Sequence, residues 1–234
     1  MIIIGSKGYK NINLNNIIDT FDKNLRFNMS LPYHNNGTKC DELLCNNHVY
    51  KFLQKNQISR SELIRTYSRL LEKDYIDFFA KNYRKSRFSR IYNRIQPNAN
   101  NEMPSLTDFL HKLKCPIQCP ANNYFRVGLE GILHNINKTN KPILVGFSIV
   151  YSSIIKTFHN IPKKSLHPIK EEAEIIKWLH NNNYIDATLC CLEDTMPPTL
   201  ECKDIKPSRQ IINLLIKEYG VCNFKNYPQK HSIK

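Results

Sequence analysis

A glycine-containing turn near the start of the chain is the first stretch whose residue types could do chemistry. Gly5, Ser6, Lys7 and Gly8 follow three consecutive isoleucines. β-branched residues in a row suit a strand buried on both faces, and glycine lets backbone N–H groups approach a ligand closely. An amphipathic stretch follows, so one interpretation is a phosphate bound near a helix N-terminus, as in nucleotide-binding α/β domains. The turn lacks the full G-x-G-x-x-G pattern, and an ordinary first strand ending in a tight turn is the alternative.

A second candidate is the basic segment Lys81–Arg94, which carries much of the net charge of +14. Its lysines and arginines are interleaved with Tyr83, Phe88 and Tyr92. This mixture can bind single-stranded nucleic acid, and it also suits a helix on anionic lipid. A solvated helix face in a basic protein is the third interpretation. The charge itself fits nucleic acid, an anionic membrane surface or a small anionic substrate.

The eight cysteines have the spacing of neither a disulfide framework nor a zinc knuckle. Cys40 and Cys45 are separated by four residues and Cys115 and Cys119 by three, so neither pair is C-x2-C. We therefore expect free thiols and no metal site. Cys190 and Cys191 should be small buried hydrophobic residues on a strand.

Length and composition predict one α/β domain over residues 1–234. A chain of 234 residues with 41% hydrophobic residues can bury one sizeable core. The longest apolar runs, such as residues 143–150, have the length of strands rather than of membrane spans. The first residues lack a secretory signal, because Lys7 and Lys10 follow only three isoleucines. We expect a cytoplasmic protein.

Hydrophobic periodicity predicts alternating strands and helices. We expect strands near residues 2–4, 25–27, 41–45, 142–150 and 184–192. Helices should start near Ser105 and at Pro168 and should cover residues 127–136 and 208–219, with Gly220 ending the last one. This alternation indicates a mostly parallel sheet with helices on both faces. Residues 50–120 show helical patterns without strands, which predicts a helical insert or lid.

Three stretches of the chain resemble the motifs of one enzyme family. The first joins Ile2–Tyr9 to an R-x-N pattern at Arg26-Phe-Asn28 and a G-x-K-C-(x5)-N pattern from Gly37 to Asn46. The second, residues 128–146, is similar to a helix that begins with Ser-Gly and the strand after it. The third begins with His167, which precedes a helix by the family's spacing. The family is the bacterial sialyltransferases of the glycosyltransferase family 42 type, found in host-mimicking mucosal bacteria.

The resemblance implies a GT-A-like nucleotide-binding α/β fold, a CMP-activated sugar donor, inversion at the anomeric carbon and no required metal or other cofactor. His167 would be the general base that deprotonates the acceptor hydroxyl, and Tyr151 would hold the donor phosphate. The other donor-binding positions would be Gly5, Ser6, Gly8, Asn28, Asn46, Gly128 and Ser148. The acceptor would be a glycan or glycolipid such as lipooligosaccharide. Lys81–Arg94 would then contact the anionic inner face of the inner membrane, and a homo-oligomer is compatible with this assignment.

Local chemistry is consistent with these roles. A histidine with an ordinary pKa near 6.5 accepts a proton at neutral pH, and an acidic group such as Glu172 could orient His167. The departing CMP accumulates phosphate charge, which tyrosine hydroxyls or backbone donors stabilise without a metal.

Two positions depart from the family pattern. Arg126-Val127 stands where the family has Ser or Thr before the glycine, and Gly146-Phe147-Ser148 replaces Gly-x-Asp. A serine forms hydrogen bonds but holds no charge beside the base. A different donor sugar, or a degenerate transferase that binds nucleotide without turnover, are therefore alternatives, as is a basic nucleic-acid-binding protein that uses Lys81–Arg94. The family resemblance favours the transferase.

Overall fold

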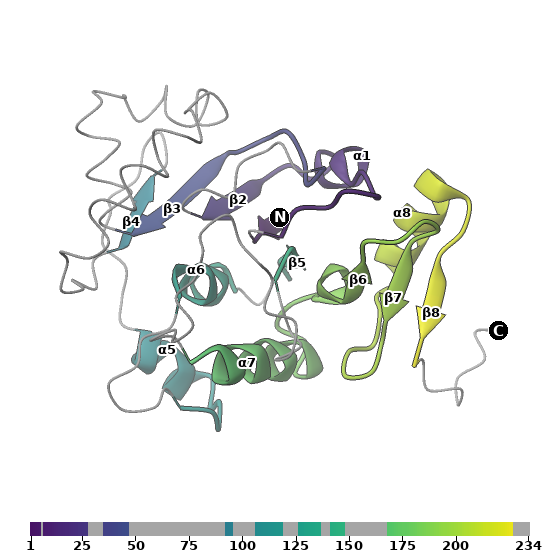
Figure 1. The fold of residues 1–234 in the computed structure, drawn as a ribbon. Coiled ribbons are helices and arrows are strands. Elements are labelled where there is room, and N and C mark those ends of the chain that lie inside the picture. Colours follow the sequence, from purple (N-terminus) through teal and green to yellow (C-terminus); the bar gives the residue numbers. More distant parts are fainter. Residues whose placement is uncertain are drawn as a thin grey trace.

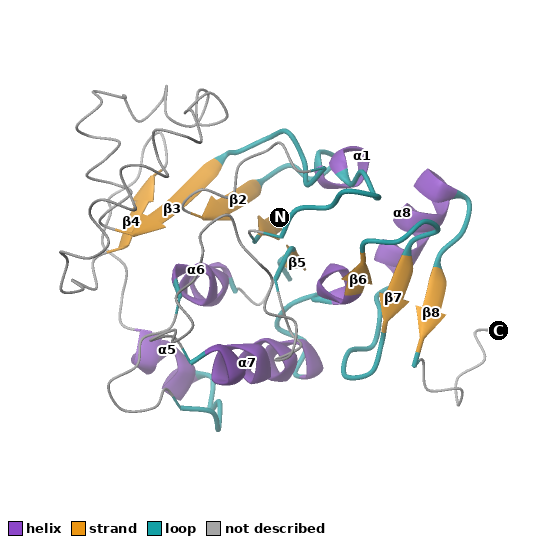
Figure 2. Cartoon of the chain, in the orientation of Figure 1, coloured by secondary structure: helices purple, strands orange, loops and turns teal. Residues whose placement is uncertain are grey.

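The computed structural model describes residues 1–5, 7–27, 35–46, 92–95, 106–118, 126–136, 141–147 and 168–226. Figures 1 and 2 show its helices and strands, which are, in chain order, β1 (Ile2–Ile4), α1 (Asn15–Ile18), β2 (Asn24–Phe27), β3 (Glu42–Asn46), β4 (Tyr92–Ile95), α5 (Leu106–Lys112), α6 (Val127–Asn135), β5 (Ile143–Val145), α7 (Ile169–Asn181), η2 (Thr188–Cys191), β6 (Leu192–Glu193), β7 (Thr199–Glu201), α8 (Arg209–Tyr219) and β8 (Asn223–Lys225).

The main sheet has five strands in the order β4-β3-β2-β1-β5. β1, β2, β3 and β5 are parallel to one another, and β4 joins the edge antiparallel to β3. The chain thus adds β2 and β3 on one side of β1 and returns to place β5 on the other side. The expected α/β class and mostly parallel sheet are confirmed. The strand order reverses between β1 and β5, and open α/β sheets bind their ligands at the carboxyl edge of such a position.

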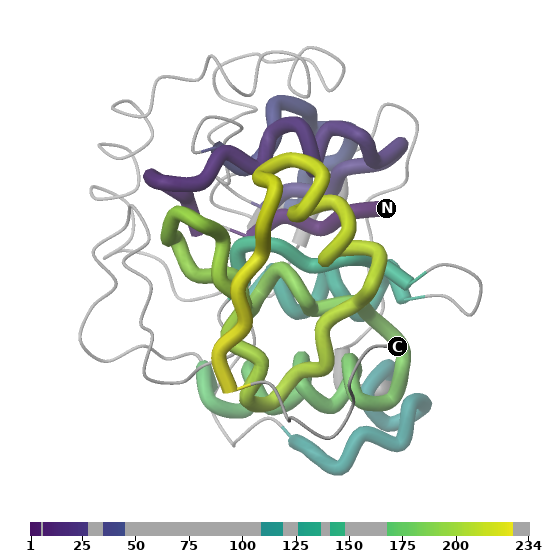
Figure 3. Tube along the Cα trace, turned by 90° about the vertical axis from the view of Figure 1, so that its right-hand side faces the viewer, coloured from purple at the N-terminus to yellow at the C-terminus, as the bar shows by residue number. Residues whose placement is uncertain are grey.

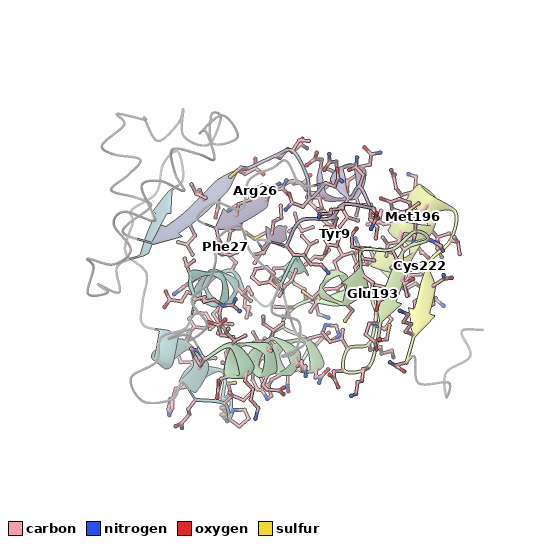
Figure 4. All side chains as sticks on the ribbon, in the orientation of Figure 1. Tyr9, Arg26, Phe27, Glu193, Met196 and Cys222 are labelled. Atoms are coloured by element: carbon pink, nitrogen blue, oxygen red, sulfur yellow. The ribbon has the colours of Figure 1, made fainter. Side chains whose placement is uncertain are left out.

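Helices cover both faces of the sheet (Figure 1). Successive strand residues point to opposite faces, so Phe27 and Arg26 of β2 mark the two sides. Phe27 points toward α6 (Figure 4), where a Cβ built on Gly131 would overlap the Phe27 ring. Arg26 faces the α1 side, where Ile18 lies nearby. The β1 residues between these layers are fully buried, at 0% exposure, as predicted for a strand covered on both faces.

A smaller sheet of β6, β7 and β8 packs at the C-terminal end of the chain. β6 pairs antiparallel with β7, which pairs parallel with β8. Helix α8 joins this part to α1, because Asn16 donates to Glu218 at 2.8 Å and the Tyr219 hydroxyl donates to the Asn13 carbonyl. Figure 3 faces this end of the molecule and shows the yellow segment of α8 and β8 toward the viewer, with its upper part in front of the purple N-terminal segment.

The helix predictions are confirmed where local signals were strong. Ser208 caps α8 by accepting from the Ile211 N–H, and Gly220 ends the helix with a φ of +77°. Helix α6 fills the expected range, and α5 starts one residue after Ser105. Pro168 lies one position earlier than expected, at the N-cap of α7 rather than in its first turn.

The predicted strand at residues 184–192 is wrong. Asp186 forms a single bridge with Ile143 of β5. The Asp186 carboxylate then accepts from the backbone N–H of Thr188 at 3.0 Å and from its hydroxyl at 2.6 Å. Such local side-chain bonds compete with strand pairing. The chain therefore forms the short 3-10 helix η2 before β6 begins. Cys190 and Cys191 are buried, as expected, but lie in η2.

Two further predictions need correction. Residues 92–95 form β4, although this range was expected to be helical, because the open edge of β3 supplies backbone partners that a local pattern does not reveal. The rest of the predicted helical insert lies outside the described residues, except for α5 and the chain up to residue 118. Strand β5 ends at Val145 rather than at residue 150, since Gly146 turns the backbone to a φ of +72°.

The described cysteines Cys40, Cys115, Cys190, Cys191, Cys202 and Cys222 carry free thiols. Within the described ranges, every helix is too short or too polar to cross a membrane.

Candidate functional site

Two glycines bring β1 and β5 together at the carboxyl edge of the sheet. The Gly5 N–H donates to the Val145 carbonyl at 2.7 Å, and the Lys7 N–H donates to Gly146 at 3.2 Å. A Cβ built on Gly5 would lie 2.7 Å from the carbonyl carbon of Gly146. Gly5 is needed because the Gly146 backbone approaches it closely, and Gly146 is needed because its backbone is left-handed.

A buried arginine holds a second loop against the turn after β1. Arg26 is 0% exposed and donates to carbonyl oxygens of Lys39 at 2.7 Å and Asn36 at 3.0 Å. Its guanidinium also donates to the Asn36 side chain at 3.3 Å, and that side chain reaches the Lys7 carbonyl at 3.5 Å. Arg26, quoted above in the R-x-N pattern, therefore positions the loop 35–40 beside the turn.

The backbone that follows the turn is bound by a carboxylate of the chain itself. Asp194 accepts from the N–H groups of Lys10 at 2.8 Å, Asn11 at 2.8 Å and Ile12 at 3.2 Å. Its own carbonyl accepts from the Asn11 side chain at 2.8 Å. These donors would otherwise suit an anionic ligand. Because Asp194 occupies these donors, an anionic ligand could contact only the earlier part of the turn.

Lys7 lies in that earlier part of the turn and is half-buried. Its Nζ donates to the Leu192 carbonyl at 2.9 Å and lies 5.0 Å from the ring centroid of Tyr9. Burial lowers the pKa of Lys7, and the negative charge of Asp194 partly opposes this shift. Burial also raises the pKa of Tyr9, which is 2% exposed and belongs to the core.

The start of α6 lies at the same edge. A Cβ on Gly128 would lie 3.0 Å from the ring of Phe147, which follows β5, so this glycine permits close packing there. The Arg126 backbone N–H and its guanidinium both donate to the buried carboxylate of Glu172 in α7. The Glu172 carboxylate therefore already accepts from Arg126. The suggested contact with His167 is not described, because His167 lies outside the described residues.

The described ranges contain only part of the predicted site. Gly5, Gly8 and Gly128 lie in the described backbone, and Asn46 is the last residue of β3, at the same carboxyl edge. Phe27 ends β2 directly before Asn28 in the sequence. Ser6, Asn28, Ser148, Tyr151 and His167 lie outside the described residues, as do residues 81–91 of the basic segment.

Sequence reasoning missed Lys7, Asn36 and Asp194 as site residues. Lys7 had a local signal, because it stands between two glycines after a buried strand. Asp194 had none, since its partners are 182 to 184 residues away.

Taken together, the described edge offers one half-buried ammonium, that of Lys7, whereas the N–H groups of Gly5, Lys7 and residues 10–12 already donate within the chain. An ammonium suits a phosphate-bearing molecule. Within the described residues, no cluster of three or more His, Cys, Asp or Glu side chains has the arrangement of a metal site.

Comparisons of the chain with protein-family models, with curated proteins and with solved structures found no match.

Proposed function

We propose that this chain is a sialyltransferase-like glycosyltransferase that moves a sugar, sialic acid in the first instance, from a CMP-activated donor to a surface glycan. One observation carries the proposal. The carboxyl ends of the parallel strands β1, β2, β3 and β5 lie at a single edge of the sheet. Most of the positions named by the resemblance are in these strand ends or follow them in the sequence. This agreement is independent of the motifs, because it depends on how the strands pair.

The proposed reaction is one inverting displacement. The acceptor hydroxyl oxygen attacks the anomeric carbon while the bond from that carbon to the CMP phosphate oxygen breaks. His167 takes the hydroxyl proton, and Tyr151 donates to the departing phosphate. Asn28 and Asn46 bind the nucleotide, and Gly5 to Gly8 and Gly128 lie along the donor. No metal is required in this scheme.

The structure gives a physical context for one departure from the family pattern. Arg126, which stands just before Val127 and Gly128, donates to the buried Glu172 carboxylate. This ion pair joins the first residues of α6 and α7, and His167 precedes α7 in the chain. We propose that the pair holds the start of α7 in place for the base, while Ser148 supplies a hydrogen bond where the family has a carboxylate.

The finer assignments belong to the same proposal. They are a GT-A-like fold, a lid within residues 50–120, and Lys81–Arg94 as a contact to anionic lipid at the inner face of the membrane. A positively charged surface attracts both a nucleotide-sugar and such a membrane.

The direct test is turnover of CMP-sialic acid by the full chain, read as release of CMP, with a glycan acceptor. We expect His167→Ala to lower kcat roughly 100- to 10,000-fold, the usual contribution of a positioned general base. His111→Ala is the matched control, because His111 is exposed in the last turn of α5. Equal activity of His167→Ala and wild type would contradict the assignment of the base. CMP binding without turnover would identify the degenerate transferase.

A further inference from the structure

We infer that Lys7 is a phosphate-binding residue, and that its ammonium pairs with the phosphate of a nucleotide bound at the carboxyl edge between β1 and β5. The inference rests on the proposed nucleotide site but adds a contact that the family motifs do not contain.

The first argument is position. Lys7 follows β1 by three residues, and its backbone N–H donates to Gly146 at the end of β5. Its carbonyl accepts from the Asn36 side chain, which Arg26 holds in place. The residue is therefore anchored on both sides at the point where the strand order reverses, which is where an open α/β sheet binds its ligand.

The second argument is that the charge of the Lys7 ammonium is not paired with a carboxylate among the described residues. An ammonium has three donors, and the described residues supply Nζ with one hydrogen-bond acceptor, the Leu192 carbonyl. Three other lysines of the described ranges pair with carboxylates: Lys23 with Glu42, Lys177 with Glu174 and Asp204, and Lys225 with Glu193. Lys7 has no carboxylate within ion-pair distance in the described part of the chain, although it is half-buried. A half-buried cation without a counter-ion gains strongly from an anionic ligand.

The third argument concerns Asp194, the carboxylate with the largest electrostatic effect on Lys7. Asp194 lies close enough to influence Lys7 electrostatically, but its oxygens accept from the backbone N–H groups of residues 10–12. Asp194 thereby occupies the N–H groups that could otherwise bind an anion after the turn. Lys7, which comes earlier in the chain, keeps its positive charge without a carboxylate of the described residues bound to it. A phosphate at the edge would therefore pair with the Lys7 ammonium, because the N–H groups of Gly5 and Lys7 already donate to Val145 and Gly146.

The test compares CMP with cytidine, which differ by the phosphate alone, in calorimetric titrations of the full chain. Wild type should bind CMP more tightly than cytidine. Lys7→Met should weaken CMP binding roughly 10- to 100-fold, the value of a charge-assisted contact, and leave cytidine binding unchanged. Lys7→Arg should restore much of the CMP affinity. Lys10→Met is the control, because the Lys10 side chain is exposed and the Asp194 contact uses its backbone.

The outcomes separate the two proposals. CMP affinity that is unchanged in Lys7→Met, or an equal loss for CMP and cytidine, would overturn the role of Lys7 while the nucleotide site stands. Binding of inorganic phosphate that depends on Lys7, without any binding of CMP, would support Lys7 and overturn the CMP donor. Absence of binding of CMP, cytidine and phosphate to wild type would overturn both.

Discussion

Gly5 shows at the scale of one residue why the turn after β1 has its sequence. Its N–H continues the β1–β5 ladder, and the space that a side chain would need is filled by the Gly146 backbone. Backbone atoms cannot rotate away as a side chain can. The glycine is therefore a requirement of the sheet edge.

We predict that Gly5→Ala lowers the free energy of unfolding by about 1–3 kcal/mol, because overpacking displaces backbone. Gly128→Ala is the comparison, since its new Cβ would meet only the edge of the Phe147 ring at 3.0 Å. Alanine also favours a helix over glycine by about 1 kcal/mol, so Gly128→Ala should be close to neutral. Urea denaturation measures both. Equal losses in the two variants would contradict the close contact of Gly5 with Gly146.

His180 gives a pH-dependent prediction at the same scale. Its Nδ1 accepts from the Ala187 N–H at 3.1 Å, and its Nε2 lies 3.1 Å from the Lys206 carbonyl. A ring that accepts at Nδ1 is neutral, and burial lowers the pKa of His180 from its ordinary value of 6.5. The unfolded chain therefore takes up this proton first as the pH falls.

The stabilisation by His180 should accordingly be complete above about pH 6.5 and decrease below it. We predict that the difference in unfolding free energy between wild type and His180→Asn shrinks from about pH 7.5 to about pH 5.5, since asparagine does not titrate. Chemical denaturation at both pH values measures it. A difference that stays constant, or that grows toward acid, would show that His180 is not held neutral.

At the scale of elements, the Arg126–Glu172 pair fixes the starts of α6 and α7 relative to each other. The Glu172 side chain is 2% exposed, whereas the Arg126 side chain is 36% exposed. Removing the carboxylate would leave the Arg126 N–H without its acceptor. We predict that Glu172→Ala costs about 1–3 kcal/mol of unfolding free energy.

The control for this pair is Glu174→Ala on the same helix, where the Glu174 side chain is 49% exposed and its ion pair with Lys177 is worth at most about 1 kcal/mol. A double-mutant cycle with Arg126→Met should show that the two losses are coupled. Additive losses, or a Glu172→Ala effect no larger than the control, would mean that the pair does not join the helices.

Elements with local signals were predictable from the sequence, and long-range contacts were not. Ser208 and Gly220 mark the two ends of α8, and three isoleucines mark β1, so these elements were found. The β3–β4 pairing replaced a predicted helix because it depends on a distant partner. The Asp186 turn replaced a predicted strand because the Asp186 carboxylate bonds to Thr188 two residues later, a local signal that the apolar pattern of residues 184–192 concealed. The glycine turn was proposed from the sequence as a candidate site, but its contacts with Gly146 and Asp194 required the fold.

At the scale of the whole molecule, the first and last parts of the chain meet at Asp194. Its carboxylate and carbonyl bind residues 10–12, and Lys7 binds the Leu192 carbonyl beside it. The small C-terminal sheet thus supports the turn that follows β1, so the shape of the edge depends on both ends of the chain.

We predict that Asp194→Ala lowers the free energy of unfolding by about 1.5–3 kcal/mol, because backbone N–H groups lose a charged acceptor. Glu193→Ala is the neighbouring control, since its ion pair with Lys225 lies at the surface and should contribute less than about 1 kcal/mol. Denaturant titration measures both variants. Equal losses would indicate that the Asp194 contacts do not hold the turn.

The central claim, a nucleotide site at the carboxyl edge, is tested most directly by thermal unfolding of the full chain with CMP, CDP, UDP or GDP. A ligand that binds the native state raises the midpoint in proportion to its affinity and concentration. We predict saturable stabilisation that is greatest with CMP and is lost in Asn28→Ala. No shift with any of the four nucleotides at millimolar concentration would contradict the site.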